Sequence, residues 1–122
     1  MGNQVLLVED EPNIIEAVGF ILARDGWSVA THANGLTAME EIRRVMPDVL
    51  VLDVMLPGRS GYEVLKELRG DGLFKALPVL MLTARGQEKD RAEAQKLGAT
   101  RFMTKPFANA ELLDVVREIS GT

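Results

Sequence analysis

The chain has 122 residues, of which 47% are hydrophobic and 26% charged, a balance typical of one globular domain with a buried core. Its formal net charge of −4 and its lack of basic runs argue against direct binding to nucleic acid. Cysteine is absent, which excludes disulfides and thiolate metal sites. The sequence shows no signal region and no run of membrane-spanning length, so a cytoplasmic protein is expected.

Three segments are predicted to form strands buried on both faces: residues 4–8, which carry four apolar residues in a row, and the apolar runs 49–52 and 79–82. Such strands belong in the middle of a parallel sheet. Residues 27–31 alternate between apolar and polar side chains, and residues 101–104 form a short polar segment. These two segments are therefore predicted as the edge strands of the same sheet.

Two helices are predicted in the first half of the chain. Pro12 suits the first turn of one helix, and Gly26 is placed to end it. Asn34 and Gly35 are predicted to open the second helix, which Pro47 ends. Their apolar faces are predicted to carry Ile14, Ile15, Val18, Ile21 and Leu22 in the first helix, and Leu36, Met39, Ile42 and Met46 in the second.

Three further helices are predicted in the second half. Ser60 and Glu63 form a capping box, the S-x-x-E signature of a helix start. Residues 87–97 are helical by propensity but poor in large apolar side chains, so this helix is predicted to dock weakly. The last helix presents an apolar face made of Leu112, Val115, Val116 and Ile119.

Strict alternation of strands and helices predicts parallel strands joined by right-handed crossovers. With the most apolar strands in the middle, the expected fold class is α/β, flavodoxin-like (βα)5. This fold has a five-stranded parallel sheet of order 2-1-3-4-5 with helices on both faces. Because ligands of such sheets bind at the carboxyl ends of the strands, we expect the functional residues there.

Polar side chains stand at the carboxyl ends of four predicted strands: Glu9 and Asp10, Asp53, Thr83, and Lys105. Three crowded carboxylates repel one another unless a cation lies among them. Oxygen ligands without histidine or cysteine favour Mg²⁺ or a similar hard ion such as Mn²⁺. A carboxylate beside a metal ion, an ammonium group and a hydroxyl is suited to accept a phosphoryl group, and Asp53 is predicted to be that carboxylate.

Four pieces of sequence match a known family: Glu9–Asp10, Asp53 within DVMLPGRSG, Thr83–Ala84 within LTAR, and Lys105–Pro106–Phe107. With these pieces in order, the chain resembles the receiver domain of bacterial two-component response regulators over essentially its whole length. The resemblance implies that Asp53 is the phosphoacceptor. It implies that the donor is the phosphohistidine of a sensor histidine kinase or of a phosphotransfer protein.

The resemblance also implies how the metal and the phosphoryl group are held. Side chains of Asp10 and Asp53, the backbone carbonyl of Met55 and, through water, Glu9 are expected to bind Mg²⁺ or Mn²⁺. The phosphoryl group is expected to contact Thr83, Ala84 and Lys105. The Lys105–Pro106 peptide bond is expected to be cis, the isomer that aims the lysine into the acidic pocket.

Thr83 and Phe102 are the implied switch pair, since the family's aromatic residue changes rotamer as the threonine moves. Many relatives carry tyrosine there, so partner contacts that need a hydroxyl are not available to Phe102. The resemblance implies that Met55 and Arg85 flank the path of the water that hydrolyses the acyl phosphate. Neither side chain can act as a general base, so slow loss of the phosphoryl group is expected.

The implied output surface comprises residues 87–97, residues 101–104 and the last helix, and its partner is a downstream protein or a missing effector domain. Many DNA-binding receivers carry two acidic residues at the positions of Thr100 and Arg101, and these acids form salt bridges between the two receivers of a dimer. Because this chain lacks them, a monomer or weak dimer is expected. Residues 1–122 are expected to be a single receiver domain without an effector domain. No membrane partner and no enzymatic activity beyond self-phosphorylation and autodephosphorylation are expected.

Other functions share part of this pattern. An Mg²⁺-dependent aspartyl-phosphate phosphatase of the haloacid-dehalogenase kind needs a second Asp two residues after the nucleophile, where this chain has Met55. In a flavin carrier, the acids at 9–11 would repel the cofactor phosphate. A receiver-like interaction module that is not phosphorylated is a further alternative. Simpler roles also remain open: Glu9 as a solvated acid, Thr83 as a strand end and Phe102 as static core.

Overall fold

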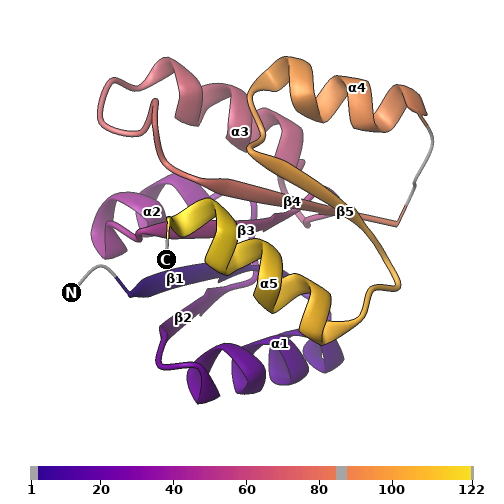
Figure 1. Ribbon diagram of the computed structural model, residues 1–122. Coiled ribbons are helices and arrows are strands. Elements are labelled where there is room, and N and C mark those ends of the chain that lie inside the picture. The colour runs from indigo at the N-terminus through magenta and orange to yellow at the C-terminus, as the bar shows by residue number, and fades with distance from the viewer. Residues whose placement is uncertain (1–2, 85–87, 122) are drawn as a thin grey trace.

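A computed structural model describes residues 3–84 and 88–121 of the chain. Five parallel strands form one sheet in the order β2-β1-β3-β4-β5, so the predicted strand order is confirmed (Figure 1). The edge strands are the two more polar ones, as the sequence predicts. The strands are β1 (Gln4–Val8), β2 (Ser28–His32), β3 (Val49–Asp53), β4 (Val79–Thr83) and β5 (Arg101–Thr104).

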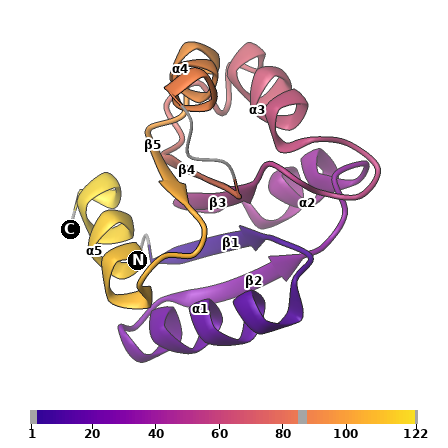
Figure 2. The ribbon, with the colours of Figure 1, turned by 90° about the vertical axis from the view of Figure 1, so that its right-hand side faces the viewer.

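Five helices cover both faces of the sheet (Figure 2). Each face has its own buried core. Helices α1 (Pro12–Arg24) and α5 (Asn109–Ser120) cover one face. Helices α2 (Ala38–Val45), α3 (Gly61–Gly70) and α4 (Glu88–Leu97) cover the other. Every residue of β3 and β4 is buried, because helices cover these central strands on both sides.

The register of the strands brings their carboxyl ends to one edge of the sheet. Val8 lies beside Leu52 in the neighbouring strand, and Asp53 lies beside Leu82. Thr83 pairs in turn with Thr104, the residue before Lys105. The residues that follow β1, β3, β4 and β5 therefore emerge side by side.

Helix α3 begins against the end of β3. The predicted capping box is confirmed, since the Ser60 hydroxyl accepts from the Glu63 N–H at 3.3 Å and the Glu63 carboxylate accepts from the Ser60 N–H at 3.4 Å. A Cβ atom on Gly61 would lie 2.2 Å from the carbonyl oxygen of Asp53. Glycine at this position thus lets the helix start directly against the carboxyl end of β3.

Helix α2 starts later than predicted. Asn34 and Gly35 form a turn before the helix, in which the Asn34 side-chain oxygen accepts from the Leu36 N–H at 2.7 Å. Leu36 is 66% exposed, and Met46, 51% exposed, ends the helix in the left-handed conformation. The hydrogen bond of Asn34 stabilises a turn where the spacing of apolar residues predicted a helix. Of the predicted apolar face, only Met39 and Ile42 are therefore buried.

Helix α4 is held to the molecule by few contacts. Ala94 is its one buried residue within Glu88–Leu97, in agreement with the predicted weak docking. Polar contacts hold its two ends. The Tyr62 hydroxyl lies 3.4 Å from the Asp90 carbonyl oxygen, while Arg69 Nε donates to the Gly98 carbonyl at 2.9 Å. The carboxyl end is therefore tied more closely than the amino end.

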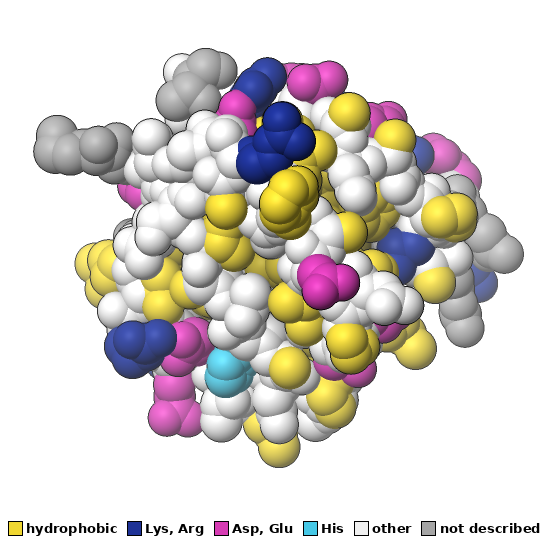
Figure 3. All heavy atoms as spheres, turned by 90° about the horizontal axis from the view of Figure 1, so that it is seen from below, with side chains coloured by type: hydrophobic (Ala, Val, Ile, Leu, Met, Phe, Trp, Pro, Cys, Tyr) yellow, Lys and Arg dark blue, Asp and Glu magenta, His cyan; other side chains and the backbone are white. Residues whose placement is uncertain are grey.

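Figure 3 shows one face of the molecule, on which basic and acidic side chains are scattered among hydrophobic ones. Within residues 3–84 and 88–121, no helix has the length and apolar character that crossing a membrane requires.

Candidate functional site

Three carboxylates meet where β1 and β3 end. Glu9, Asp10 and Asp53 each offer an oxygen, and these oxygens lie within 4.8 Å of one another. Glu9 is fully buried and Asp53 is 1% exposed, whereas Asp10 faces solvent. The alternative that Glu9 is a solvated acid is therefore wrong. The parallel strands place these groups together because they end at the same edge.

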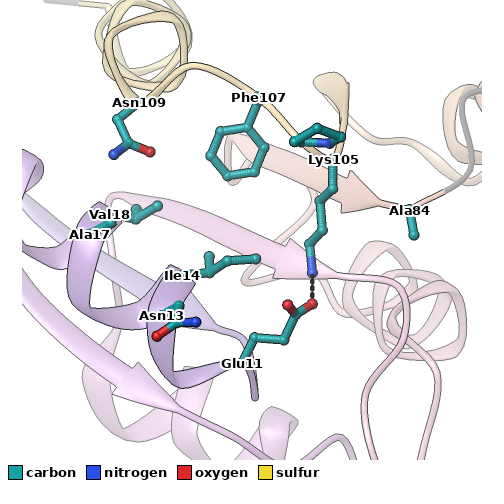
Figure 4. A pocket seen from close by; sticks show the side chains of 10 residues that line it. Glu11, Asn13, Ile14, Ala17, Val18, Ala84, Lys105, Phe107 and Asn109 are labelled. Carbon is teal, nitrogen blue, oxygen red and sulfur yellow. Dashed lines mark hydrogen bonds and ion pairs between the residues drawn. The ribbon is translucent and has the colours of Figure 1, made fainter.

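Lys105 reaches this cluster from the end of β5. Its ammonium nitrogen lies 3.3 Å from Asp53 Oδ2 and 3.1 Å from Glu9 Oε1. It also lies 2.9 Å from Glu11 Oε1, a contact visible in Figure 4. The Lys105–Pro106 peptide bond is cis, as predicted. A single ammonium group thus faces three carboxylates.

Burial and mutual repulsion perturb these groups. Burial raises the pKa of Glu9, and the charge of Asp53 raises it further. Burial also raises the pKa of Asp53, although Lys105 opposes that shift. Burial lowers the pKa of Lys105, but hydrogen bonds with Glu11 and Glu9 outweigh it, so its pKa lies above the ordinary value. The pocket holds more negative charge than Lys105 balances.

The residues present fit a hard divalent cation. Glu9 Oε1 is buried and receives no hydrogen bond from the described part of the chain, although Lys105 Nζ lies near it as an ion partner. Such an orphaned oxygen suits a metal ion or a metal-bound water. With Asp10 and Asp53 beside it, the donor set consists of carboxylate oxygens, which Mg²⁺ and Mn²⁺ accept.

The predicted phosphoryl contacts lie at the end of the neighbouring strand. Thr83 ends β4 and is 3% exposed, while Ala84 after it is exposed. Met55 is 66% exposed on the loop after β3, and its N–H lies 3.4 Å from Asp53 Oδ1. Arg85, the other residue predicted to control hydrolysis, lies outside the described residues.

Phe102 is half-buried on β5 and packs against the core on the α4 side. The guanidinium of Arg91, on α4, lies over its ring at 5.2 Å from the centroid. This contact links the predicted switch residue to the weakly docked helix. The sequence reasoning missed Arg91, because nothing in the order of residues shows that α4 passes over β5.

A cavity of about 440 Å³ adjoins the acidic pocket on the side of α1. Figure 4 shows Ile14, Val18 and Phe107 lining it, with the Glu11–Lys105 ion pair along one side. The sequence reasoning also missed Glu11 as a partner of Lys105. Its place directly after Glu9–Asp10 was the available signal.

The fold is a five-stranded parallel α/β sheet, and its carboxyl edge carries an acidic, metal-compatible pocket, a threonine and a lysine. This combination defines a class of phosphoryl-accepting signalling domains. The sequence model for the response regulator receiver domain matches residues 5–117. The chain belongs to the response regulator receiver domain family. The predicted family and fold class are both confirmed.

Individual relatives agree with this assignment. The chain is 37% identical over 119 residues to the phosphate regulon transcriptional regulatory protein PhoB of Escherichia coli, which covers 98% of this chain and 52% of PhoB. The chain thus spans about half the length of this relative.

Two solved structures are similar over nearly their whole length. The chemotaxis response regulator CheY4 of Vibrio cholerae has a TM-score of 0.91 and 31% identity, covering 98% of this chain and 99% of that chain. The receiver domain of the sensor histidine kinase PA1611 of Pseudomonas aeruginosa PAO1 has a TM-score of 0.89 and 30% identity, covering 100% of both chains. That domain holds a magnesium ion in its active site cleft.

The general function of the family is a phosphorylation switch in two-component signal transduction. Receiver domains interact with sensor kinases and downstream effectors and are generally not true enzymes.

Proposed function

We propose that this chain is switched by transfer of a phosphoryl group from a sensor-kinase phosphohistidine, or from a phosphotransfer protein, to Asp53. The observation that carries this proposal is the buried Asp53 carboxylate, which lies 3.3 Å from Lys105 Nζ and next to two further carboxylates. A carboxylate in this setting is poorly neutralised and open to an electrophilic phosphorus.

In the transfer, a carboxylate oxygen of Asp53 forms a bond to phosphorus while the bond between phosphorus and the donor's imidazole nitrogen breaks. The nitrogen keeps the electron pair of that bond. Lys105 neutralises negative charge on the phosphoryl oxygens, and the Thr83 hydroxyl donates to one of them. Asp10, Asp53, the Met55 carbonyl and, through water, Glu9 would hold Mg²⁺ or Mn²⁺, which supplies charge stabilisation of the phosphoryl oxygens.

The experiment that tests this proposal is incubation with acetyl phosphate and Mg²⁺, followed by intact-mass spectrometry. Wild type and Asp114→Asn, a control on exposed α5 surface, should each gain one phosphoryl group. Asp53→Asn should gain none, and chelation of the metal should abolish uptake by all variants. Equal incorporation in wild type and Asp53→Asn would remove Asp53 from its role.

The surface formed by α4, β5 and α5 is the proposed output face, and its partner is a downstream protein or an effector domain. Support comes from the few buried anchors of α4 and from Arg91, which connects that helix to Phe102. On this proposal the chain acts in the cytoplasm as a monomer or weak dimer. It catalyses nothing beyond the gain and loss of its own phosphoryl group.

A further inference from the structure

Lys105 has a third acidic partner outside the group that could bind metal. Among its ion pairs, the one with Glu11 is the shortest, at 2.9 Å, against 3.1 Å to Glu9 and 3.3 Å to Asp53. The Glu11 side chain is 58% exposed, while that of Lys105 is 12% exposed. Glu11 therefore contacts the ammonium group from the solvent side (Figure 4). The buried carboxylates of Glu9 and Asp53 contact it from inside the protein.

The backbone keeps Glu11 in this position. Pro12 follows it and restricts it to extended conformations, and Glu11 has φ −83° and ψ 115°. Its N–H donates to Glu9 Oε2 at 3.1 Å. Glu11 is the N-cap of α1, yet its side chain makes no capping hydrogen bond. The carboxylate is thus directed to Lys105 instead of to the first turn of the helix.

We propose that Glu11 is a positioning residue that tethers Lys105 at the mouth of the acidic pocket in the unphosphorylated protein. This inference rests on the proposed phosphorylation of Asp53. A phosphoryl group on Asp53 competes with Glu11 for the same ammonium group. As the Lys105 ammonium group moves towards the phosphoryl oxygens, its ion pair with Glu11 weakens or breaks. Glu11 therefore favours the resting form and weakens the hold of the pocket on a phosphoryl group.

The magnitude of this effect follows from the exposure of Glu11. Ion pairs with an exposed partner are screened by water, so the tether should change the affinity for a phosphoryl analogue by about two- to five-fold. The matched control is Glu16, which is likewise an exposed glutamate and lies in the second turn of α1, after the N-cap Glu11. Glu11→Gln and Glu16→Gln remove the same charge from the same helix region, but only the first contacts Lys105.

Calorimetric titration with beryllofluoride in the presence of Mg²⁺ tests the proposal. Glu11→Gln should bind about two- to five-fold more tightly than wild type, Glu11→Asp should restore part of the difference, and Glu16→Gln should match wild type. In a Lys105→Met background, Glu11→Gln should have no effect, because the partner it acts through is gone. Tightening that persists in that background would reflect charge alone and would overturn the proposal.

A second measurement needs neither metal nor phosphoryl analogue. In the metal-free protein, the NMR signal of the Lys105 Cε–Hε group should shift in Glu11→Gln and stay in place in Glu16→Gln. An unmoved signal, or unchanged binding by Glu11→Gln beside a wild type that binds beryllofluoride, would overturn the tether alone. A wild type that neither binds beryllofluoride nor gains a phosphoryl group would overturn the proposed function, and with it this inference.

Discussion

At the scale of single residues, the buried carboxylates of Glu9 and Asp53 destabilise the metal-free fold. Both have folded-state pKa values above their ordinary values of 4.5 and 3.8, chiefly because burial disfavours their charged forms. The folded protein then binds more protons than the unfolded chain between the ordinary and the raised pKa values. Its stability therefore falls as pH rises through that window.

Asp53→Asn should remove one of the two buried charges and, with it, the repulsion that Asp53 exerts on Glu9. At pH 7 and without metal, we expect the variant to have a free energy of unfolding higher than wild type by about 1 kcal/mol or more. The difference should shrink towards zero well below pH 3.8, where the Asp53 carboxyl of wild type is protonated in both the folded and the unfolded state. Urea unfolding followed by circular dichroism at several pH values measures it, with Asp114→Asn as the neutral control. Equal stability of wild type and Asp53→Asn at pH 7 would contradict the prediction.

Two other residues are predicted to set the lifetime of the phosphorylated form. Met55 is apolar and exposed beside Asp53, so it can obstruct water but cannot orient it. Arg85 has no acceptor atom, and its part in the prediction rests on the sequence alone. Met55→Asn combined with Arg85→Glu should speed dephosphorylation by about tenfold or more. Loss of phosphate from purified, phosphorylated protein gives the rate, and an unchanged or slower rate would show that these side chains do not control water.

At the scale of elements, the start of α3 leaves no room for a side chain. Gly61→Ala would place a methyl group 2.2 Å from the Asp53 carbonyl oxygen, so the strand or the helix must shift. We expect a loss of about 1–3 kcal/mol in the free energy of unfolding and slower phosphoryl uptake. Gly70→Ala is the matched control at the other end of the helix, where a Cβ atom meets nothing within 4 Å. That variant should be neutral or slightly stabilised. Equal free energies of unfolding for Gly61→Ala and wild type would refute the steric argument.

Helix α4 should respond to phosphorylation more than the other helices. Ala94 is its one buried residue in Glu88–Leu97, and its amino end is held by a long contact between Tyr62 and Asp90. Binding of beryllofluoride with Mg²⁺ should therefore change hydrogen exchange in α4 and β5. The carboxyl end of α4, which Arg69 holds, should change least. Protection that changed only in α1 and α2 would show that the output face lies elsewhere.

Local patterns made most of these elements predictable. The apolar run of β3, the capping box of α3 and the polar residues at the strand ends each depend on neighbours in sequence. The predicted start of α2 was wrong because the Asn34 side chain accepts a hydrogen bond from the Leu36 N–H, and this turn competes with helix formation. Contacts between segments that are distant in the sequence could not be predicted from local patterns. Glu11 and Lys105 are 94 positions apart, and Arg69 and Gly98 are 29 apart.

At the scale of the whole molecule, the strand order follows from a simple rule. The three strands made of apolar residues occupy the centre, because helices bury them on both faces, and the two more polar strands take the edges. Parallel strands then bring Glu9, Asp53, Thr83 and Lys105 to one edge, although they are spread over the chain. The grouping of these residues could therefore be predicted from the sequence, because the strand order could be predicted from it.

The same parallel arrangement separates the only tryptophan from the acidic pocket. Trp27 is 7% exposed and precedes β2, so it lies at the amino edge of the sheet, whereas Asp53 ends β3 at the carboxyl edge. A five-residue strand, about 17 Å long, lies between the two edges. Indole fluorescence should therefore stay unchanged when beryllofluoride binds, yet shift strongly in urea. A change on beryllofluoride binding would reveal that the sheet carries the signal to its far edge. If the fluorescence spectrum is unchanged on beryllofluoride binding, Trp27 reports unfolding of the protein without responding to occupation of the acidic pocket.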